Sequence, residues 1–393
     1  RLKILILLKI KDFFIKMKGF GDINKSKKKK IKKIKSSKEE IINQAILLHL
    51  KGNIKEAEEY YQQIIKKGCT DDRVFSNYSV ILQSQGELNK AELYSRTAIA
   101  INPKNSNAYL NLGNILQDYG KLQEAEFSYR KAIELNPKFA DAAWNLYGIS
   151  NNIDEAEKRI NLCLTIDQNH LKAKLTLSAL KFHQGDQSLF DHFMKSNYKD
   201  HPIMRSLKWV STLPKLPELY FHRWAVFDDM TKISEKNRPF YEFGVWRGES
   251  FKYLINTFKK GYGFDTFNGI PEDWHDENIG QYSAKGIIPK IDGGTFIAGK
   301  FEDTLPKFFS NPRPIASIVN FDADLYSSTL CALNFSKPII DKKTILIFDE
   351  FLTNKNWELD EYKALNEFCS KNNFNYEVLA VSYISKQVAV RLI

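Results

Sequence analysis

A period of 34 residues recurs through the first half of the chain. Gly52, Gly86 and Gly120 stand 34 residues apart, and alanines and prolines repeat at the same interval. The repeating alanines and prolines are Ala57, Ala91, Ala125, Pro103 and Pro137. Glycine adopts the left-handed backbone of a tight turn, small alanine lets two helices cross closely, and proline ends a helix. The period therefore predicts an array of helical hairpins, and it constrains the fold more than any other feature.

One unit of this array, residues 107–140, reads NAYLNLGNILQDYGKLQEAEFSYRKAIELNPKFA. It resembles the tetratricopeptide repeat, and the agreement extends over about residues 40–185, with one unit three residues short. The resemblance implies an all-α superhelix whose concave face binds peptide or protein ligands. We expect residues 38–199 to form this superhelix and to recruit a protein partner. No catalytic residue is expected within it.

The net charge of +11 is located in the N-terminal segment. Residues 1–37 carry 14 Lys and Arg against two Asp, so the remaining 356 residues sum to about −1. We interpret residues 1–37 as a basic disordered tail, with weak contact to an anionic membrane as the alternative. The folded part is nearly neutral, so no nucleic-acid partner is expected. Met17 is an alternative start, which leaves open whether residues 1–16 belong to the native protein.

Targeting signals and cysteines point to the cytoplasm. The apolar N-terminal stretch is interrupted by lysines and is too short to cross a bilayer, so no transmembrane segment is expected. No small-residue cleavage site follows it, which argues against a secretory signal. The four cysteines lie far apart and contain no CxxC pair, as is typical of reduced cytosolic thiols.

From residue 240 onward, apolar strand-like runs alternate with helical segments, which predicts a parallel sheet with helices on both faces. The last two runs, at 376–380 and 387–392, are separated by only six residues. That connection is too short for a parallel crossover, so they must form an antiparallel hairpin. A sheet that is parallel except for a C-terminal hairpin is typical of class I methyltransferases. We therefore expect a helical linker over 200–239 and an α/β domain over 240–393.

The turn after the first of these runs differs from the dinucleotide-binding pattern. Gly244 and Gly248 allow a ligand to approach the backbone at the start of a helix, but Trp246 replaces the second glycine of G-x-G-x-x-G. The acidic Glu242 opposes a pyrophosphate and suits the amino group of a methionine moiety instead. Asp265 ends the second run, 21 residues after Gly244, where an acid can accept both ribose hydroxyls.

Five segments of the second half together resemble the sugar O-methyltransferases typified by macrocin O-methyltransferase. These segments are FYEFGVWRGES, YGFDTFNGIPEDW, GKFEDTLP, FDADLYSST and IFDEF. The resemblance covers about residues 220–393 and implies a Rossmann-like class I methyltransferase domain that uses S-adenosyl-L-methionine. It implies cofactor contacts at Glu242, Gly244, Gly248, Ser250 and Asp265, with Phe301, Glu302 and Asp303 near the adenine. It also implies Mg²⁺ held by Asp322, Asp349 and Glu350, although the family often has paired aspartates at the last two positions.

Oxygen ligands suit a hard cation, and a metal on vicinal acceptor oxygens would favour hydroxyl deprotonation and orient the attacking atom. The alternative is that these acids cap turns or helices, as Asp324 does if it begins the helix that follows. We expect Asp322, Asp324 and Glu350 to be catalytic. The general base is left open among Asp324, Glu350 and His275. His275 lies in a polar stretch, 271–294, that we interpret as a substrate lid, with a surface histidine as the alternative.

The sequence therefore predicts an S-adenosylmethionine-dependent, metal-assisted O-methyltransferase for a sugar or polyol hydroxyl on a small-molecule or glycan acceptor. The alternative is a repeat scaffold protein with a catalytically inactive methyltransferase-like domain. Degeneration usually removes glycine or aspartate first, and every expected glycine and acid is present here. The acceptor, the methylated position, the repeat partner and the oligomeric state are not determined by the sequence.

Overall fold

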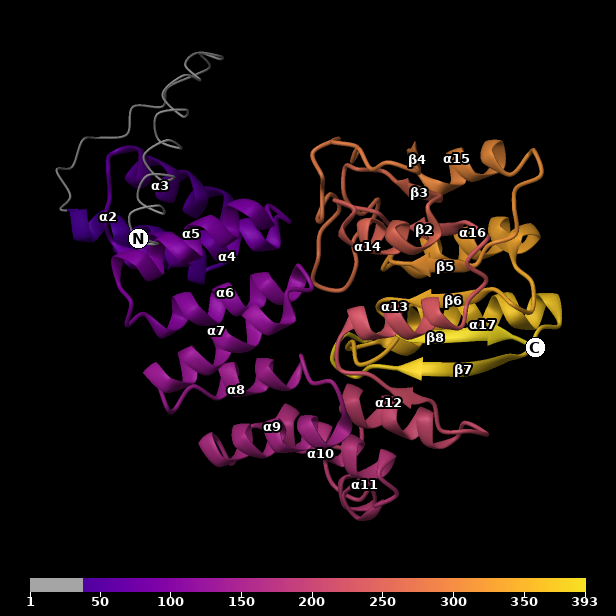
Figure 1. Cartoon of the computed structure of the whole chain (residues 1–393), viewed down its shortest axis with the longest axis horizontal. Coiled ribbons are helices and arrows are strands. Elements are labelled where there is room, and N and C mark those ends of the chain that lie inside the picture. Colours follow the sequence, from indigo (N-terminus) through magenta and orange to yellow (C-terminus); the bar gives the residue numbers. More distant parts are fainter. Residues whose placement is uncertain (1–37) are drawn as a thin grey trace. The chain divides into compact units, whose positions relative to one another are not determined.

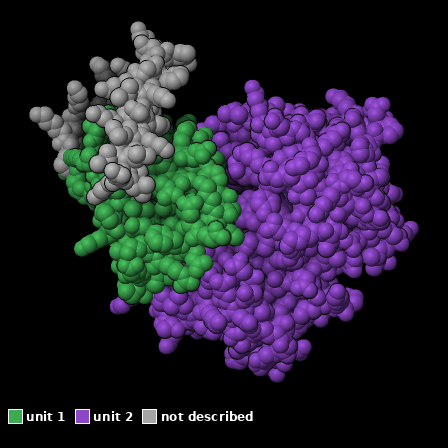
Figure 2. Space-filling view, viewed as in Figure 1, with its two compact units in different colours: residues 1–137 green, residues 138–393 purple. Residues whose placement is uncertain are grey.

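The computed structural model describes residues 38–393. The interpretation of residues 1–37 as a basic tail that contacts anionic lipid lies outside the described residues. The chain divides into two compact units, the first ending at Pro137 and the second running from Lys138 to Ile393 (Figure 2). Each helix in the described chain is too short or too polar to cross a membrane.

The described part of the first unit is a succession of helical hairpins (Figure 1). Its helices are α2 (Lys38–Leu50), α3 (Ile54–Lys66), α4 (Asp72–Ser84), α5 (Leu88–Ile101), α6 (Ser106–Asp118) and α7 (Leu122–Leu135). Gly52, Gly86 and Gly120 lie in the turns within the pairs α2–α3, α4–α5 and α6–α7, with φ angles of 77°, 67° and 72°. These are left-handed backbones that favour glycine. The turns predicted from the 34-residue period are confirmed.

Close helix packing in this unit is clearest at Gly113 of α6. A Cβ atom there would lie 2.4 Å from Cε1 of Tyr129 on α7, far inside carbon contact distance. Tyr129 is fully buried, and its hydroxyl donates to Gln117 Oε1 at 2.7 Å, with Asn114 Oδ1 at 3.0 Å. The small residue therefore lets a large aromatic ring fill the space between two helices.

The second unit begins with further helices. They are α8 (Ala140–Tyr147), α9 (Ile153–Ile166), α10 (Leu171–His183), α11 (Ser188–Met194), α12 (Pro202–Ser211) and α13 (Arg223–Lys232). All regular secondary structure within residues 38–200 is helical, as predicted. The predicted domain boundary between 199 and 200 follows the repeat period, whereas the compact unit starts at Lys138. The difference arises because α10 and α12 bury Ala179 and Leu207 in one hydrophobic core with Val388 of the sheet.

The second unit contains an eight-stranded mixed sheet in the order β1-β7-β8-β6-β5-β2-β3-β4. The strands are β1 (Glu218–Leu219), β2 (Phe240–Phe243), β3 (Gly261–Asp265), β4 (Gly294–Ala298), β5 (Ile318–Phe321), β6 (Ile345–Phe348), β7 (Tyr376–Val381) and β8 (Val388–Leu392). Neighbouring strands are parallel except around β8, which runs antiparallel to both β6 and β7. The predicted C-terminal hairpin is confirmed. Strand β1 comes from 200–239, so this expected helical linker also contributes to the sheet.

Helices cover both faces of the sheet. After the strands come α14 (Glu249–Phe258), α15 (Phe301–Phe308), α16 (Tyr326–Ser336), α17 (Glu361–Asn372) and the 3₁₀ turns η1 (Lys337–Ile339) and η2 (Trp357–Leu359). On β2, Phe240 packs against Phe251 of α14, with ring centroids 4.6 Å apart. Phe243 packs against Phe301 of α15 at 5.6 Å. These two positions on a strand point to opposite faces, so α14 and α15 lie on opposite sides.

Candidate functional site

The predicted site residues gather where the parallel strands end. Asp322 follows β5 and Asp349 follows β6, while Gly244 follows β2 and Asp265 ends β3. The order of strands reverses between β2 and β5, because β3 and β4 continue on one side and β6 on the other. Such a switch point opens a crevice beyond the strand ends, where α/β sheets bind ligands. A Cβ at Gly244 (φ 91°) would lie 1.8 Å from the Asp322 carbonyl oxygen, so this position requires glycine.

Asp265 holds the glycine loop in place. Its Oδ2 accepts the backbone N–H groups of Val245 at 2.8 Å and Trp246 at 2.7 Å. Its Oδ1 accepts the N–H of Phe267. Since each carboxylate oxygen has two lone pairs, Oδ1 keeps one acceptor position in this arrangement. The structure thus brings together the loop and the spaced acid.

Glu242 is a fully buried acid beside this loop. The Ser250 hydroxyl, in the first turn of α14, donates to Glu242 Oε1. Burial raises the pKa of Glu242 to about 8, against the opposing effects of the Ser250 hydrogen bond and the Arg223 charge. Within the described chain, no donor meets hydrogen-bond geometry at Glu242 Oε2, although the side-chain amide of Asn320, its neighbour on β5, is near enough to lower the pKa of Glu242. A buried carboxyl oxygen of this kind is a candidate contact for a polar ligand.

The predicted catalytic acids Asp322, Asp324 and Glu350 also come together. Burial, followed by the charge of Asp349, raises the pKa of Asp322 well above its usual value. Burial and the charges of Glu350 and Asp349 do the same to the pKa of Asp324, which has a left-handed backbone with φ 60°. Burial likewise raises the pKa of Glu350. A fifth acid, Glu361 of α17, is fully buried beside them, and its Oε2 accepts the N–H of Glu350 at 3.0 Å.

Two cations of the chain are bound to these acids. The Arg223 guanidinium forms an ion pair with Asp349 Oδ2 and lies 3.9 Å from Asp322 Oδ2. The Lys386 ammonium lies 2.8 Å from Glu350 Oε2. The predicted Mg²⁺ ligands are therefore engaged with the protein itself. Across residues 38–393, no group of three His, Cys, Asp or Glu side chains is arranged to hold an ion. The residues present do not fit the predicted metal site.

The expected lid segment, 271–294, approaches the acids through Tyr282. Burial and the nearby charges of Glu277, Asp324 and Glu350 raise the pKa of this phenol. His275 is exposed, as the surface-histidine alternative has it, and its Nε2 lies 2.8 Å from Asp360 Oδ2. This partner is an acid outside the set proposed from the sequence.

The residues predicted near the adenine begin α15, after β4. The Phe301 side chain is buried against Phe243, whereas Glu302 and Asp303 are exposed. The adenine assignment stays a prediction.

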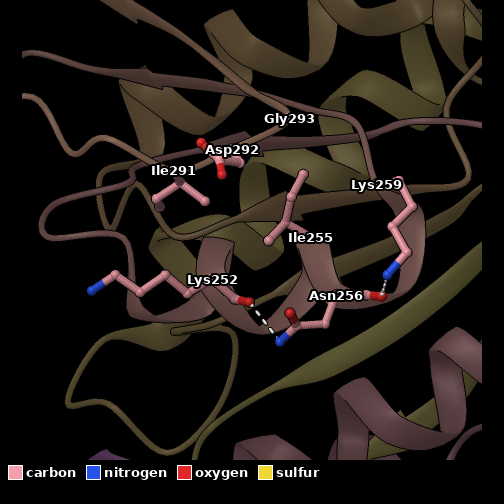
Figure 3. Close-up of a pocket in the computed structure, with 7 residues that line it drawn as sticks. All are labelled: Lys252, Ile255, Asn256, Lys259, Ile291, Asp292 and Gly293. Carbon is pink, nitrogen blue, oxygen red and sulfur yellow. Dashed lines mark hydrogen bonds between the residues drawn. The ribbon is translucent and has the colours of Figure 1, made fainter.

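A separate open pocket lies beside α14 and the segment 291–293 (Figure 3). Its lining residues are Lys252, Ile255, Asn256, Lys259, Ile291, Asp292 and Gly293. Lys259 comes before β3 and Gly293 directly before β4, so the pocket lies towards the edge where these strands begin. It contains none of the predicted site residues, and we assign it no part in the chemistry.

Sequence reasoning missed the partners that come from distant segments: Asn320, Arg223, Glu361, Lys386 and Gln387. Only Asn320 left a signal, because it is a polar residue inside an otherwise apolar strand, two positions before Asp322. The others come from the linker, the start of α17 and the hairpin turn, and no motif marks them.

Comparison with known proteins identifies the repeats. Family models described as tetratricopeptide repeat match residues 72–105 and 106–139, so α4–α7 are tetratricopeptide repeats. No curated protein sequence matches the chain.

Solved structures with local similarity fall into two groups. CalS11, a calicheamicin methyltransferase, is 20% identical, with 43% of this chain and 77% of that chain covered and a TM-score of 0.34. PilF of Pseudomonas aeruginosa is 18% identical, with 44% and 84% covered and a TM-score of 0.39. YrrB, a tetratricopeptide repeat protein with an unusual peptide-binding site, is 16% identical, with 43% and 90% covered and a TM-score of 0.36. Likenesses this low carry no argument about function.

Proposed function

We propose that the sheet of the second unit belongs to an S-adenosylmethionine-dependent O-methyltransferase acting on a sugar or polyol hydroxyl. The observation that carries the proposal is the buried Glu242 carboxyl at the switch point between β2 and β5, with Oε2 unpartnered among the described residues. An ammonium group would supply the missing donor and favour the charged carboxylate. The cofactor's methionine moiety carries such a group.

The remaining parts of the cofactor have suitable partners along the strand ends. Gly244 and Gly248 have positive φ angles of 91° and 80° and bring no side chain to the two ends of the loop. Asp265 Oδ1 retains an acceptor position for a ribose hydroxyl. The start of α15 follows β4 at the same edge and would lie beside the adenine. The sheet, parallel apart from its C-terminal hairpin, supports the class I assignment by analogy of fold.

The chemistry needs a base for the acceptor hydroxyl, whose pKa is far above neutrality. A carboxylate of raised pKa is a better base than an ordinary one. Asp324 and Glu350, two of the predicted candidates, meet this condition, and so does Asp322. The acceptor oxygen would form a bond to the methyl carbon while the carbon–sulfur bond breaks. The hydroxyl proton would pass to the carboxylate, and the cofactor, having supplied the methyl group, would leave as a neutral thioether. Metal assistance is not part of this proposal, because the acids do not fit an ion.

The repeats complete the proposal as a recruiting element. Tetratricopeptide repeats bind peptide or protein segments along a concave face, and the described part of the first unit buries no acid or histidine that suggests catalysis. We propose that they bring a protein partner, or a glycan carried by one, to the second unit. The cytoplasmic location remains a prediction.

A labelled-methyl assay tests the function. The full chain is incubated with methyl-labelled S-adenosylmethionine and a panel of sugars, polyols and cell-extract glycans. Label should appear on hydroxyl oxygens, and Gly244→Ala should abolish transfer, because its Cβ cannot fit beside Asp322. Gly52→Ala is the matched control: it also has positive φ, but open space surrounds it, so transfer should persist. Cofactor binding without transfer to any acceptor would support the inactive scaffold instead.

A further inference from the structure

The ion pairs of Arg223 carry a further inference about the acid cluster, defined here as Asp322, Asp324, Asp349, Glu350 and Glu361. One guanidinium nitrogen, Nη2, pairs with Asp349 Oδ2 and lies 3.9 Å from Asp322 Oδ2. The cation therefore stands between the acids that end β5 and β6. A divalent ion bridging these two carboxylates would need the same place.

Other oxygen atoms of the predicted ligands also accept hydrogen bonds from the protein. Gln387 Nε2 donates to Asp349 Oδ1 at 2.8 Å, so both oxygens of Asp349 are engaged. Glu350 Oε2 accepts from Lys386 Nζ at 2.8 Å and from Asn354 Nδ2 at 2.6 Å. A metal bound to these three oxygens would have to displace two cations and two amides.

The segment that carries Arg223 is firmly anchored. His222 caps α13, its ring nitrogen accepting the N–H of Ala225 at 3.1 Å. Trp224 and Phe227 are buried and contact the Tyr253 ring of α14, at centroid distances of 4.7 and 6.1 Å. These contacts on both sides of Arg223 hold its backbone in place.

The position of Arg223 in α13 runs against helix electrostatics. A cation at the first residue of a helix faces the positive end of the macrodipole, which is unfavourable. The acids of the cluster offset this effect. The acids thus stabilise a charge that the start of the helix disfavours.

We infer that Arg223 is the resident cation of the acid cluster and that its guanidinium takes the place of a divalent metal. Its charge offsets part of the repulsion between the acids, and the site excludes an ion bridging Asp322 and Asp349 while Arg223 is present. Guanidinium suits this role because it stays charged and pairs with carboxylates through fixed donors. The inference deepens the proposed methyl transfer by making it independent of metal, but the ion pairs stand without that function.

Direct titration with Mn²⁺ tests the inference on the full chain, with bound and free ion separated by electron paramagnetic resonance. Wild-type protein should bind Mn²⁺ at this site no more tightly than about 1 mM. Arg223→Gln should bind it at least about tenfold more tightly, and adding Asp322→Asn should remove the gain. Arg238→Gln, which breaks a separate ion pair with Asp341, is the matched control and should gain nothing.

Three results would overturn the inference. The first is tight Mn²⁺ binding by the wild-type chain that Asp322→Asn abolishes, which requires no arginine variant. The second is a folded Arg223→Gln protein without any gain, and the third is an equal gain in Arg238→Gln. Thermal unfolding of each variant establishes that it is folded, and Arg223→Lys, which keeps the charge, should stay without tight binding. Separate titration with S-adenosylmethionine distinguishes this inference from the proposed function. If the wild-type chain binds neither S-adenosylmethionine nor Mn²⁺, the proposed methyl transfer fails. The absence of Mn²⁺ binding still supports Arg223 as the resident cation.

Discussion

The two compact units bury different kinds of polar side chain. Within residues 38–137, the buried polar side chains are all hydroxyls, namely Ser76, Ser79, Ser95, Thr97 and Ser128. The second unit buries the carboxyl groups of Glu242, Asp349, Asp360 and Glu361. Burial of a charged group costs several kcal/mol unless partners offset it, so a fold gains nothing from placing acids inside for stability alone. The polar groups buried in the first unit are compatible with a purely structural role. The acids buried in the second unit lie near the strand ends, where perturbed groups are typical of a functional site.

Replacing a packing residue of the first unit should give the largest effect. Tyr129→Ala removes a fully buried ring from the contact between α6 and α7. We expect a loss of about 3–5 kcal/mol in the free energy of unfolding, with little change between about pH 5 and pH 8. Urea unfolding followed by helical circular dichroism measures it. Tyr129→Phe keeps the ring and should lose only about 1 kcal/mol of unfolding free energy. A loss of less than about 1 kcal/mol in Tyr129→Ala would show that the repeats do not depend on this packing.

Replacing a buried acid of the second unit should act in the opposite direction. The pKa of Glu242 is about 8 in the folded chain and ordinarily 4.5, so the unfolded chain releases this proton first as pH rises. The folded state therefore loses stability between about pH 4.5 and pH 8 and keeps it below pH 4.5. Glu242→Gln removes this dependence.

The expected gain for Glu242→Gln is about 2–4 kcal/mol at pH 8, shrinking towards zero near pH 4.5. Urea midpoints of both proteins at several pH values provide the measurement. The same variant should bind S-adenosylmethionine more weakly, because it loses the partner of the ammonium group. A stability difference that is independent of pH would mean that Glu242 is ionised in the folded chain, contrary to the comparison drawn above.

Local chemistry made most of the fold predictable. The turns at Gly52, Gly86 and Gly120 need left-handed backbone, and the six-residue connection before β8 forces an antiparallel hairpin. Where the compact units divide was not predictable, since α10 and α12 join the sheet core through Ala179 and Leu207. Which core an apolar helix face joins depends on tertiary packing, and periodicity alone does not reveal it.

The candidate site divides along similar lines. Asp265, Asp322 and Asp349 could be located from the sequence because parallel strands place their carboxyl ends at one edge. Arg223 could not, because it approaches from a helix about 100 residues earlier in the chain than Asp322. The acids seen without this cation favoured a metal, whereas the ion pairs are the basis for the inference that Arg223 takes the place of that metal.

Calorimetric titration of the full chain with S-adenosylhomocysteine tests the central claim, that the strand ends of the second unit form a cofactor site. We expect saturable binding, weakened by about 1–3 kcal/mol in Asp265→Ala, which loses both a ribose acceptor and the anchor of the glycine loop. Asp292→Ala, which alters the separate pocket beside α14, should bind like the wild type. Absence of binding by the wild-type chain, or equal affinity in Asp265→Ala, would contradict the account.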